Sequence, residues 1–109
     1  MRKYIDRIIE DLPNYKFDGQ KREMMKVLLL FDIKEIEIGH LLNTCYSFLI
    51  SPKESLAVRV HAMQIIFNIS EIEPELKPEL KSTLLFHIQE SSAGFKSRAN
   101  KLLKAMRHI

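Results

Sequence analysis

A long apolar stretch, Ser55-Leu-Ala-Val-Arg-Val-His-Ala-Met-Gln-Ile-Ile-Phe-Asn-Ile-Ser70, lies in the middle of this 109-residue sequence. Its apolar residues fall on nearly every side of a helix, whereas a surface helix carries them on one side only. The stretch is too short to span a bilayer, and Arg59 and His61 interrupt it. It therefore predicts a central helix packed between other elements.

Three helices are expected before this stretch. Residues 2–12 carry apolar side chains on one face and charges on the other, and a turn signal follows at residues 13–14. Asp18 is the expected N-cap of the second helix. The third helix is expected to begin near Ile36, and Gly39 inside it indicates close packing of a neighbour, because glycine is otherwise unfavourable there.

Two more helices are expected after the central stretch, the fifth from residues 73–75 and the sixth after a break at Ser91-Ser92 and Gly94. The fifth is expected to bury Leu76, Leu80, Leu84, Leu85 and Ile88, and the sixth Phe95, Ala99, Leu102, Leu103 and Met106. The first and last helices are polar on their outer faces, as terminal repeats should be. This pattern favours a complete three-repeat unit over a fragment that has lost repeats.

Equivalent positions recur about every 38 residues along the chain. The core positions Met24, Ala62 and Ala99 are 38 and 37 residues apart. A basic residue stands three positions before each of them: Lys21, Arg59 and Lys96. A period of this length is typical of helical repeats. The sequence therefore predicts one all-α domain over residues 1–109, an α-solenoid of about three antiparallel helical hairpins, with repeats at roughly residues 2–31, 34–70 and 74–109.

The repeats resemble those of the HEAT-like family. Ala57-Val-Arg-Val-His-Ala62, followed by Ile65-Ile66, is similar to the Val-Arg-x-x-Ala-x-x-x-Leu pattern of a HEAT second helix. Residues 95–103 and 20–28 are weaker copies. The resemblance covers nearly the whole chain and implies a solenoid whose concave wall is built by the second helices. It also implies a scaffold for partner proteins, and some relatives bind nucleic acid.

Residues 39–106 are similar to a group of short bacterial HEAT-like proteins of unknown function, some of which are labelled adenylosuccinate lyase. The signature loop of that enzyme, Ser-Ser-x-Met-Pro-x-Lys-x-Asn-Pro, is missing from this sequence. The chain is also far too short for the long helical core of the enzyme. The lyase activity is therefore not expected here.

The residues that could perform chemistry are scattered. No pair among His40, His61, His87 and His108 has the i,i+4 spacing of a helical metal site. Cys45 lies between apolar residues of the third helix, which favours a buried, inert thiol over a nucleophile. No glycine-rich phosphate loop is present. The sequence thus predicts that the protein is not an enzyme, with no catalytic residues, no cofactor and no metal.

Composition indicates a cytoplasmic protein. The single cysteine excludes an internal disulfide and fits a reducing compartment. The sequence has neither an apolar run of membrane-spanning length nor a basic-then-apolar leader, so no membrane association is expected.

The net charge of +3 comes from the end of the chain. Residues 1–51 have eight basic and eight acidic side chains, residues 52–93 have four and six, and residues 94–109 have five and none. Cations stabilise the C-terminal end of a helix, which is the simplest reading. A basic helix can also bind anions or nucleic acid.

Two functions remain open at this stage. The first is a protein-interaction module that uses basic side chains of the second helices, namely Lys21, Lys26, Arg59, Lys96, Arg98, Lys101 and Lys104. The second is nucleic-acid binding through the basic last helix and the concave face. Arg59 is favoured as a structural hydrogen-bond donor between repeats over a ligand contact.

Overall fold

The computed structural model describes residues 2–32, 38–89 and 91–107. Within these ranges the chain is built from six α-helices, with two 3₁₀ turns and no strand. The helices are α1 (Arg2–Asp11), α2 (Asp18–Leu29), α3 (Ile38–Ile50), α4 (Leu56–Ile72), α5 (Lys77–Ile88) and α6 (Ala93–Ala105), and the 3₁₀ turns are η1 (Leu12–Asn14) and η3 (Pro74–Leu76).

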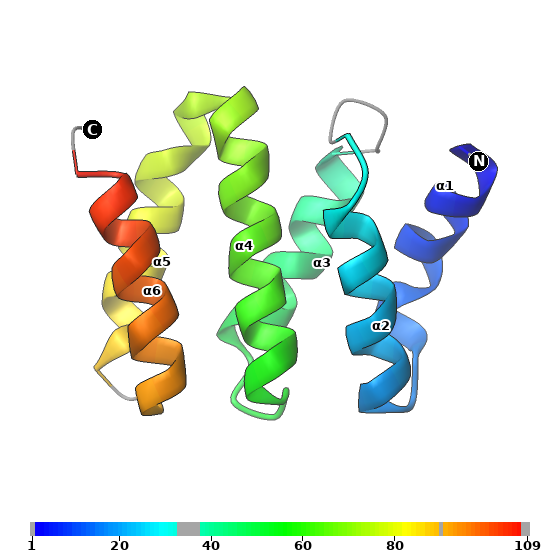
Figure 1. The fold of residues 1–109 in the computed structure, drawn as a ribbon, viewed down its shortest axis with the longest axis horizontal. Helices are drawn as coiled ribbons and strands as arrows, with labels where there is room; N and C mark the ends of the chain where they lie inside the picture. The colour runs from blue at the N-terminus through cyan, green and yellow to red at the C-terminus, as the bar shows by residue number, and fades with distance from the viewer. Residues whose placement is uncertain (1, 33–37, 90, 108–109) are drawn as a thin grey trace.

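The helices form a flat, two-layered row. Helices α2, α4 and α6 lie in front, and α1, α3 and α5 lie behind them, with successive helices running in opposite directions (Figure 1). The row measures 36 × 29 × 18 Å along its principal axes. The expected all-α solenoid of three antiparallel hairpins is confirmed.

Helix α4 is the centre of the molecule, as its sequence indicated. It packs against α2, α3, α5 and α6. Ala62, Ile66 and Ile69 are completely buried on it, and Val58 and Met63 are buried on other sides. A helix that has neighbouring helices on both sides along the row needs apolar residues around most of its circumference. This explains why the stretch lacks a single apolar stripe.

Serine caps set the beginning of two front-layer helices. The Ser55 hydroxyl accepts a hydrogen bond from the Val58 backbone N–H at 3.3 Å, and the Ser92 hydroxyl accepts one from Phe95 at 3.3 Å. The expectation that Asp18 caps α2 is wrong, because Phe17 holds the cap position without a side-chain bond. Asp18 is instead the first helical residue, where its charge opposes the positive end of the helix dipole.

The two glycines singled out in the sequence have roles different from those expected. Among the described residues, nothing lies within 4 Å of a Cβ added at Gly39, so the prediction of a close neighbour there is wrong. The expected break is confirmed at Ser91 and Ser92, whereas Gly94 lies in the first turn of α6. A Cβ at Gly94 would come within 2.6 Å of the Leu56 Cδ2 atom at the start of α4. The close approach between helices is therefore at Gly94.

The third hairpin leaves apolar side chains uncovered. Leu85 was expected in the buried stripe of α5, but its side chain is 49% exposed, and the neighbouring Phe86 is 78% exposed. Leu80 and Leu84 are fully buried as expected. Helix α5 is apolar on more than one side, and only one of these sides faces the rest of the row.

Other expectations have a mixed outcome. The buried positions expected on α6 are confirmed for Phe95, Ala99, Leu102 and Met106, with Leu103 half-buried. The predicted third-helix start at Ile36 lies outside the described residues, as does His108. In the part of the chain that the structure describes, no helix combines the length and the apolarity needed to cross a bilayer.

Candidate functional site

The recurring basic position has a different environment in each repeat. In the first hairpin, the Lys21 ammonium donates hydrogen bonds to both carboxylate oxygens of Glu54, at 2.9 and 3.0 Å. It also lies 4.8 Å from the centre of the Phe48 ring. The Lys21 side chain is only 13% exposed. Lys21 therefore joins α2 to the second hairpin and presents little surface to a partner.

Arg59, the equivalent residue on α4, is also engaged inside the chain. Its Nε–H donates a hydrogen bond to the Leu49 backbone carbonyl at 2.9 Å, near the end of α3. The guanidinium carbon lies 4.5 Å from the centre of the Phe95 ring on α6. Burial lowers the pKa of Arg59, because desolvation penalises the charged form. Arg59 is a structural donor, but its hydrogen bond stays within the second hairpin rather than between repeats as expected. Its contact with the Phe95 ring links the second and third hairpins.

Lys96, the third member of this series, is exposed on α6. The other basic side chains of that helix expected at an interaction surface, Arg98, Lys101 and Lys104, are exposed as well. None of the ion pairs in the described part of the chain includes a residue of α6. The positive charge of this helix therefore faces solvent, which leaves it available to an acidic partner.

Cations of the outer front-layer helices converge on His61 of α4. Its pKa is lowered, first by burial and then by the positive charges of Lys26, Arg98 and Arg22, with Glu23 acting in the opposite sense. Lys26 also makes an exposed ion pair with Glu23, at 3.4 Å. Sequence reasoning did not select His61 or Arg22, because a repeat alignment places residues along each helix but not across neighbouring helices.

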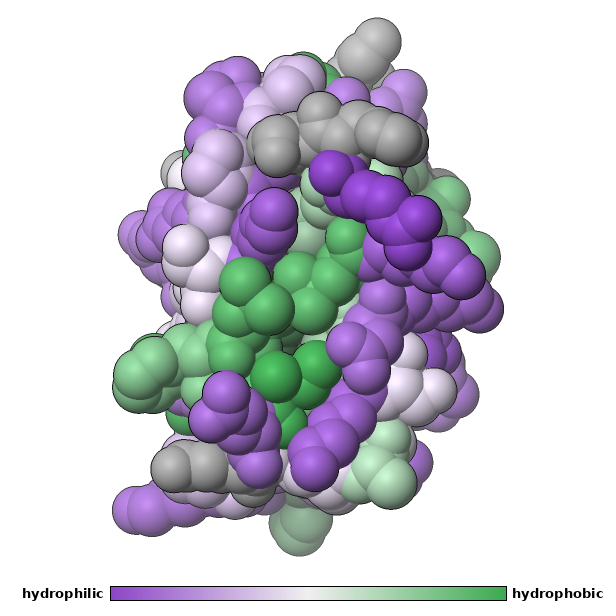
Figure 2. Space-filling model, turned by 90° about the vertical axis from the view of Figure 1, so that its left-hand side faces the viewer, coloured by the Kyte–Doolittle hydropathy of each residue, from purple (hydrophilic) through white to green (hydrophobic). Residues whose placement is uncertain are grey.

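An apolar patch covers the end of the row formed by α5 and α6. Figure 2 shows apolar side chains gathered at the centre of this end, with hydrophilic side chains on both sides. The large apolar residues of these two helices that are incompletely buried are Leu85, Phe86, Ile88 and Leu103, and we call this set the terminal patch. Exposed apolar surface rimmed by charge is typical of interaction sites. Helical periodicity placed Leu85 on an apolar face but could not tell that nothing covers it.

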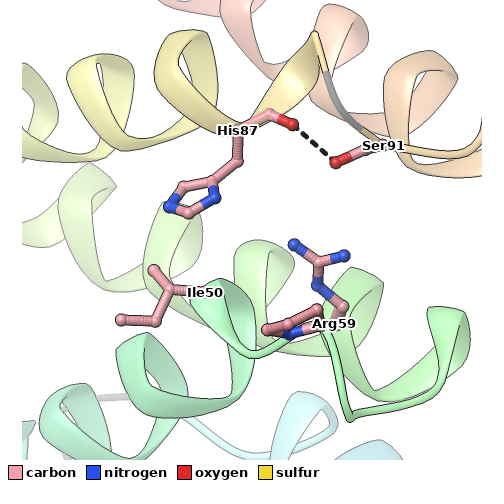
Figure 3. Close-up of a pocket in the computed structure, with 5 residues that line it drawn as sticks. Ile50, Arg59, His87 and Ser91 are labelled. Carbon is pink, nitrogen blue, oxygen red and sulfur yellow. Dashed lines mark hydrogen bonds between the residues drawn. The ribbon is translucent and has the colours of Figure 1, made fainter.

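A cavity of about 170 Å³ lies at the loop edge between the second and third hairpins. It is lined by Ile50, Pro52, Arg59, His87 and Ser91. The Arg59 guanidinium and the His87 ring project into this space from opposite walls (Figure 3). The Ser91 hydroxyl donates a hydrogen bond to the His87 backbone carbonyl at 2.6 Å, which holds the loop against the end of α5.

The sequence model of a HEAT repeat domain matches residues 1–106. The chain belongs to the HEAT repeat family. Searches of curated proteins and of solved structures gave no significant match. The recurring pattern around Arg59 and Ala62 is thus the pattern of a HEAT repeat, and the hairpins are HEAT-type helical pairs.

Two observations bear on the chemistry that this HEAT repeat domain could perform. Cys45 is fully buried, as expected, and burial raises the pKa of its thiol, which disfavours the reactive thiolate. Among the described residues, no three side chains of His, Cys, Asp or Glu gather to hold a metal ion. The features able to bind a partner or ligand are the front-layer cations, the terminal patch and the loop-edge cavity.

Proposed function

We propose that this HEAT repeat domain is a non-catalytic interaction module that binds an acidic amphipathic helix of a partner protein at its α5–α6 end. The terminal patch beside the exposed cations of α6 is the observation that carries this proposal. In helix-in-groove recognition, a partner helix lays its apolar face on such a patch. The partner thus takes the place of a further hairpin.

The chemistry of the partner follows from the two kinds of surface. Full burial of an exposed large apolar side chain contributes about 1.5–3 kcal/mol, so Leu85 and Phe86 can supply much of the binding energy. The cations of α6 have no acid within residues 94–109. Complementary charge speeds association and selects the partner more than it adds affinity. A helix with an apolar stripe and acidic flanks satisfies both requirements.

Of the seven basic residues expected at an interaction surface, we assign three on α6 to the proposed surface: Lys96, Lys101 and Lys104. Arg98 belongs to the cations around His61. Lys21 and Arg59 are left out, because Lys21 pairs with Glu54 and Arg59 contacts the Leu49 carbonyl and the Phe95 ring. Lys26 lies on α2 beside Glu23, away from the terminal patch. It belongs to the cations around His61, where an extended partner could continue across the front layer.

Two designed peptides with the same leucine stripe test this proposal, one with glutamate flanks and one with lysine flanks. We expect the acidic peptide to bind and the basic peptide to bind at least tenfold more weakly. The double variant Leu85→Ser/Phe86→Ser should weaken binding of the acidic peptide at least tenfold. Its thermal stability should change little, because both side chains are exposed. Fluorescence anisotropy measures the binding.

Leu30→Ser is the matched control, since Leu30 is 84% exposed on the first hairpin, away from α5 and α6. It should leave peptide binding unchanged. Equal binding of both peptides, or equal loss in the control variant, would contradict the proposal. Self-association through the patch is a further contrary result, which light scattering would detect as a dimer that the double variant abolishes.

Nucleic-acid binding is the second candidate function, favoured by the five cations in residues 94–109. If all five neutralise phosphates, log K should fall against log salt with a slope of about −4 to −5. Lys101→Glu/Lys104→Glu would then abolish binding, whereas Leu85→Ser/Phe86→Ser would leave it intact. The candidate is weaker because the cations outside α6 are engaged within the chain. Lys21 and Arg59 make contacts inside it, and Asp18 and Glu23 pair with the other basic residues of α2.

A further inference from the structure

The loop-edge cavity occupies the place that an ion pair fills at the other junction between hairpins. Glu54 is the residue before the N-cap Ser55, and Ser91 is the residue before the N-cap Ser92. At the first junction, the Glu54 carboxylate binds Lys21. At the second junction, Arg59 stands in the position of Lys21, but a serine hydroxyl stands in the position of the carboxylate.

The cation at the second junction keeps unused hydrogen-bond donors. A guanidinium has five N–H groups, and only the Nε–H of Arg59 donates to the Leu49 carbonyl. Within the described ranges, no carboxylate pairs with Arg59. The Leu49 bond and the Phe95 ring together fix the guanidinium plane. Its terminal nitrogens are turned toward the space below His87 and Ser91 (Figure 3).

We propose that this cavity binds a single oxyanion group, a carboxylate or a phosphate, with Arg59 as the main ligand and His87 and Ser91 on the opposite wall. This goes beyond the proposed function, because the cavity lies at the loop edge rather than at the terminal patch. A volume of about 170 Å³ holds such a group with some of its water, since one water takes up about 30 Å³ in the liquid.

The surroundings of the cavity favour an anion over a neutral group. Ile50 and Pro52 provide apolar walls, which reduce screening by water and so strengthen the attraction of a cation. A guanidinium presents its N–H groups in a planar fork that matches two oxygens of a carboxylate or phosphate. The His87 ring stands opposite the fork, whereas the Ser91 hydroxyl already donates its proton to the His87 backbone carbonyl.

NMR titration of the protein with sodium phosphate, sodium acetate and sodium chloride tests this proposal. We expect saturable shifts of the Arg59 side-chain N–H and His87 ring signals, with a dissociation constant on the order of 1 mM. Saturation by phosphate alone would identify a phosphate site, and equal saturation by phosphate and acetate a carboxylate site. Shifts that remain linear with every oxyanion, or that chloride reproduces equally, would overturn the proposal.

Substitution of Ser91 provides the variant test. Ser91→Glu places a carboxylate where Glu54 stands at the first junction, so it should abolish anion binding and raise the melting temperature. Ser91→Gln fills the same space without charge, so it should weaken binding without raising the melting temperature. Ser97→Glu, on the exposed surface of α6, makes the same charge change and should leave binding intact.

Arg59→Lys keeps the charge but removes the fork, so it should weaken binding at least tenfold. The sequence also has an acidic residue next to Ser91, Glu90. Anion binding that appears only in the variant Glu90→Gln would mean that an internal carboxylate is the occupant, and it would overturn the proposal of an external ligand. Binding that is the same in Glu90→Gln and the unchanged protein supports it.

Discussion

The two junctions between hairpins solve the same packing problem with different cations. At the first junction, the Lys21 ammonium is paired with Glu54 and lies against Phe48. At the second, the Arg59 guanidinium donates to the Leu49 carbonyl and stacks on Phe95. An ammonium is a compact, strongly hydrated charge, so burying it requires an opposite charge. A guanidinium is planar and weakly hydrated, so a ring and a carbonyl suffice, and the acid position becomes free to change.

If the second junction depends on the aromatic ring, Phe95→Ala should have the largest effect on stability. Phe95 is completely buried, and truncation of a buried phenylalanine costs about 3–5 kcal/mol of the free energy of unfolding. Urea denaturation measures this loss. Phe86→Ala is the control, because Phe86 is 78% exposed and should lose far less. Similar losses in the two variants would mean that the ring under Arg59 is not important for the junction.

Overpacking the small residue of α4 should have the next largest effect. Ala62 is fully buried on the helix that contacts both other front-layer helices. We expect Ala62→Leu to cost about 1–3 kcal/mol, because the added atoms force the neighbouring helices apart. Ala105→Leu, on the exposed side of α6, should change stability by no more than about 0.5 kcal/mol. Unchanged melting of Ala62→Leu would show that the junctions can spread without cost.

Breaking the ion pair at the first junction should have a smaller effect. The Lys21 and Glu54 side chains are 13% and 20% exposed, so this ion pair is partly buried. Lys21→Met or Glu54→Gln should each cost about 1–2 kcal/mol, with coupling between them in a double-mutant cycle. If the coupling is lost at high salt, the ion pair is screened by solvent. If there is no coupling even at low salt, the ion pair does not stabilise the first junction, and the two junctions do not differ as described.

Acidification should have the smallest effect, through His61 at the centre of the front layer. Its pKa is lowered in the folded protein, so the unfolded chain binds more protons than the folded one below the usual pKa of about 6.5. Stability should therefore fall as the pH drops below about 6.5. His61→Gln should make the loss of stability on acidification smaller. The melting temperature between pH 7.5 and pH 5.5 measures this loss. His40→Gln is the control, because His40 is exposed.

The sequence was sufficient to predict the helices, because burial on a helix leaves a 3.6-residue period that can be read directly. The repeat register was predictable for the same reason. Leu85 was placed wrongly because α5 is apolar on several sides, and periodicity cannot tell which side meets another helix. A close approach between helices was predicted at Gly39 but is found at Gly94. Such an approach depends on the neighbouring side chain, here Leu56, which the local sequence does not show.

The candidate sites were less predictable than the fold. Repeat alignment grouped Lys21, Arg59 and Lys96 correctly as equivalent positions, but it could not show that Glu54, 33 residues away, reaches Lys21. The cavity beside Arg59 combines residues of α3, α4, α5 and two loops. Such a combination exists only after the hairpins have packed, so no local signal in the sequence indicates it.

The position of α4 has a consequence for how the molecule opens. Repeat arrays can unfold one unit at a time when each unit touches only its neighbours. Here a single helix contacts members of all three hairpins, since α4 packs on α2, α3, α5 and α6. Amide protons of α4 should therefore exchange with solvent only when the whole chain unfolds, while those of α1, which packs on α3, should exchange through local fraying. We therefore expect the array to unfold as one cooperative unit, with the first helix opening more easily.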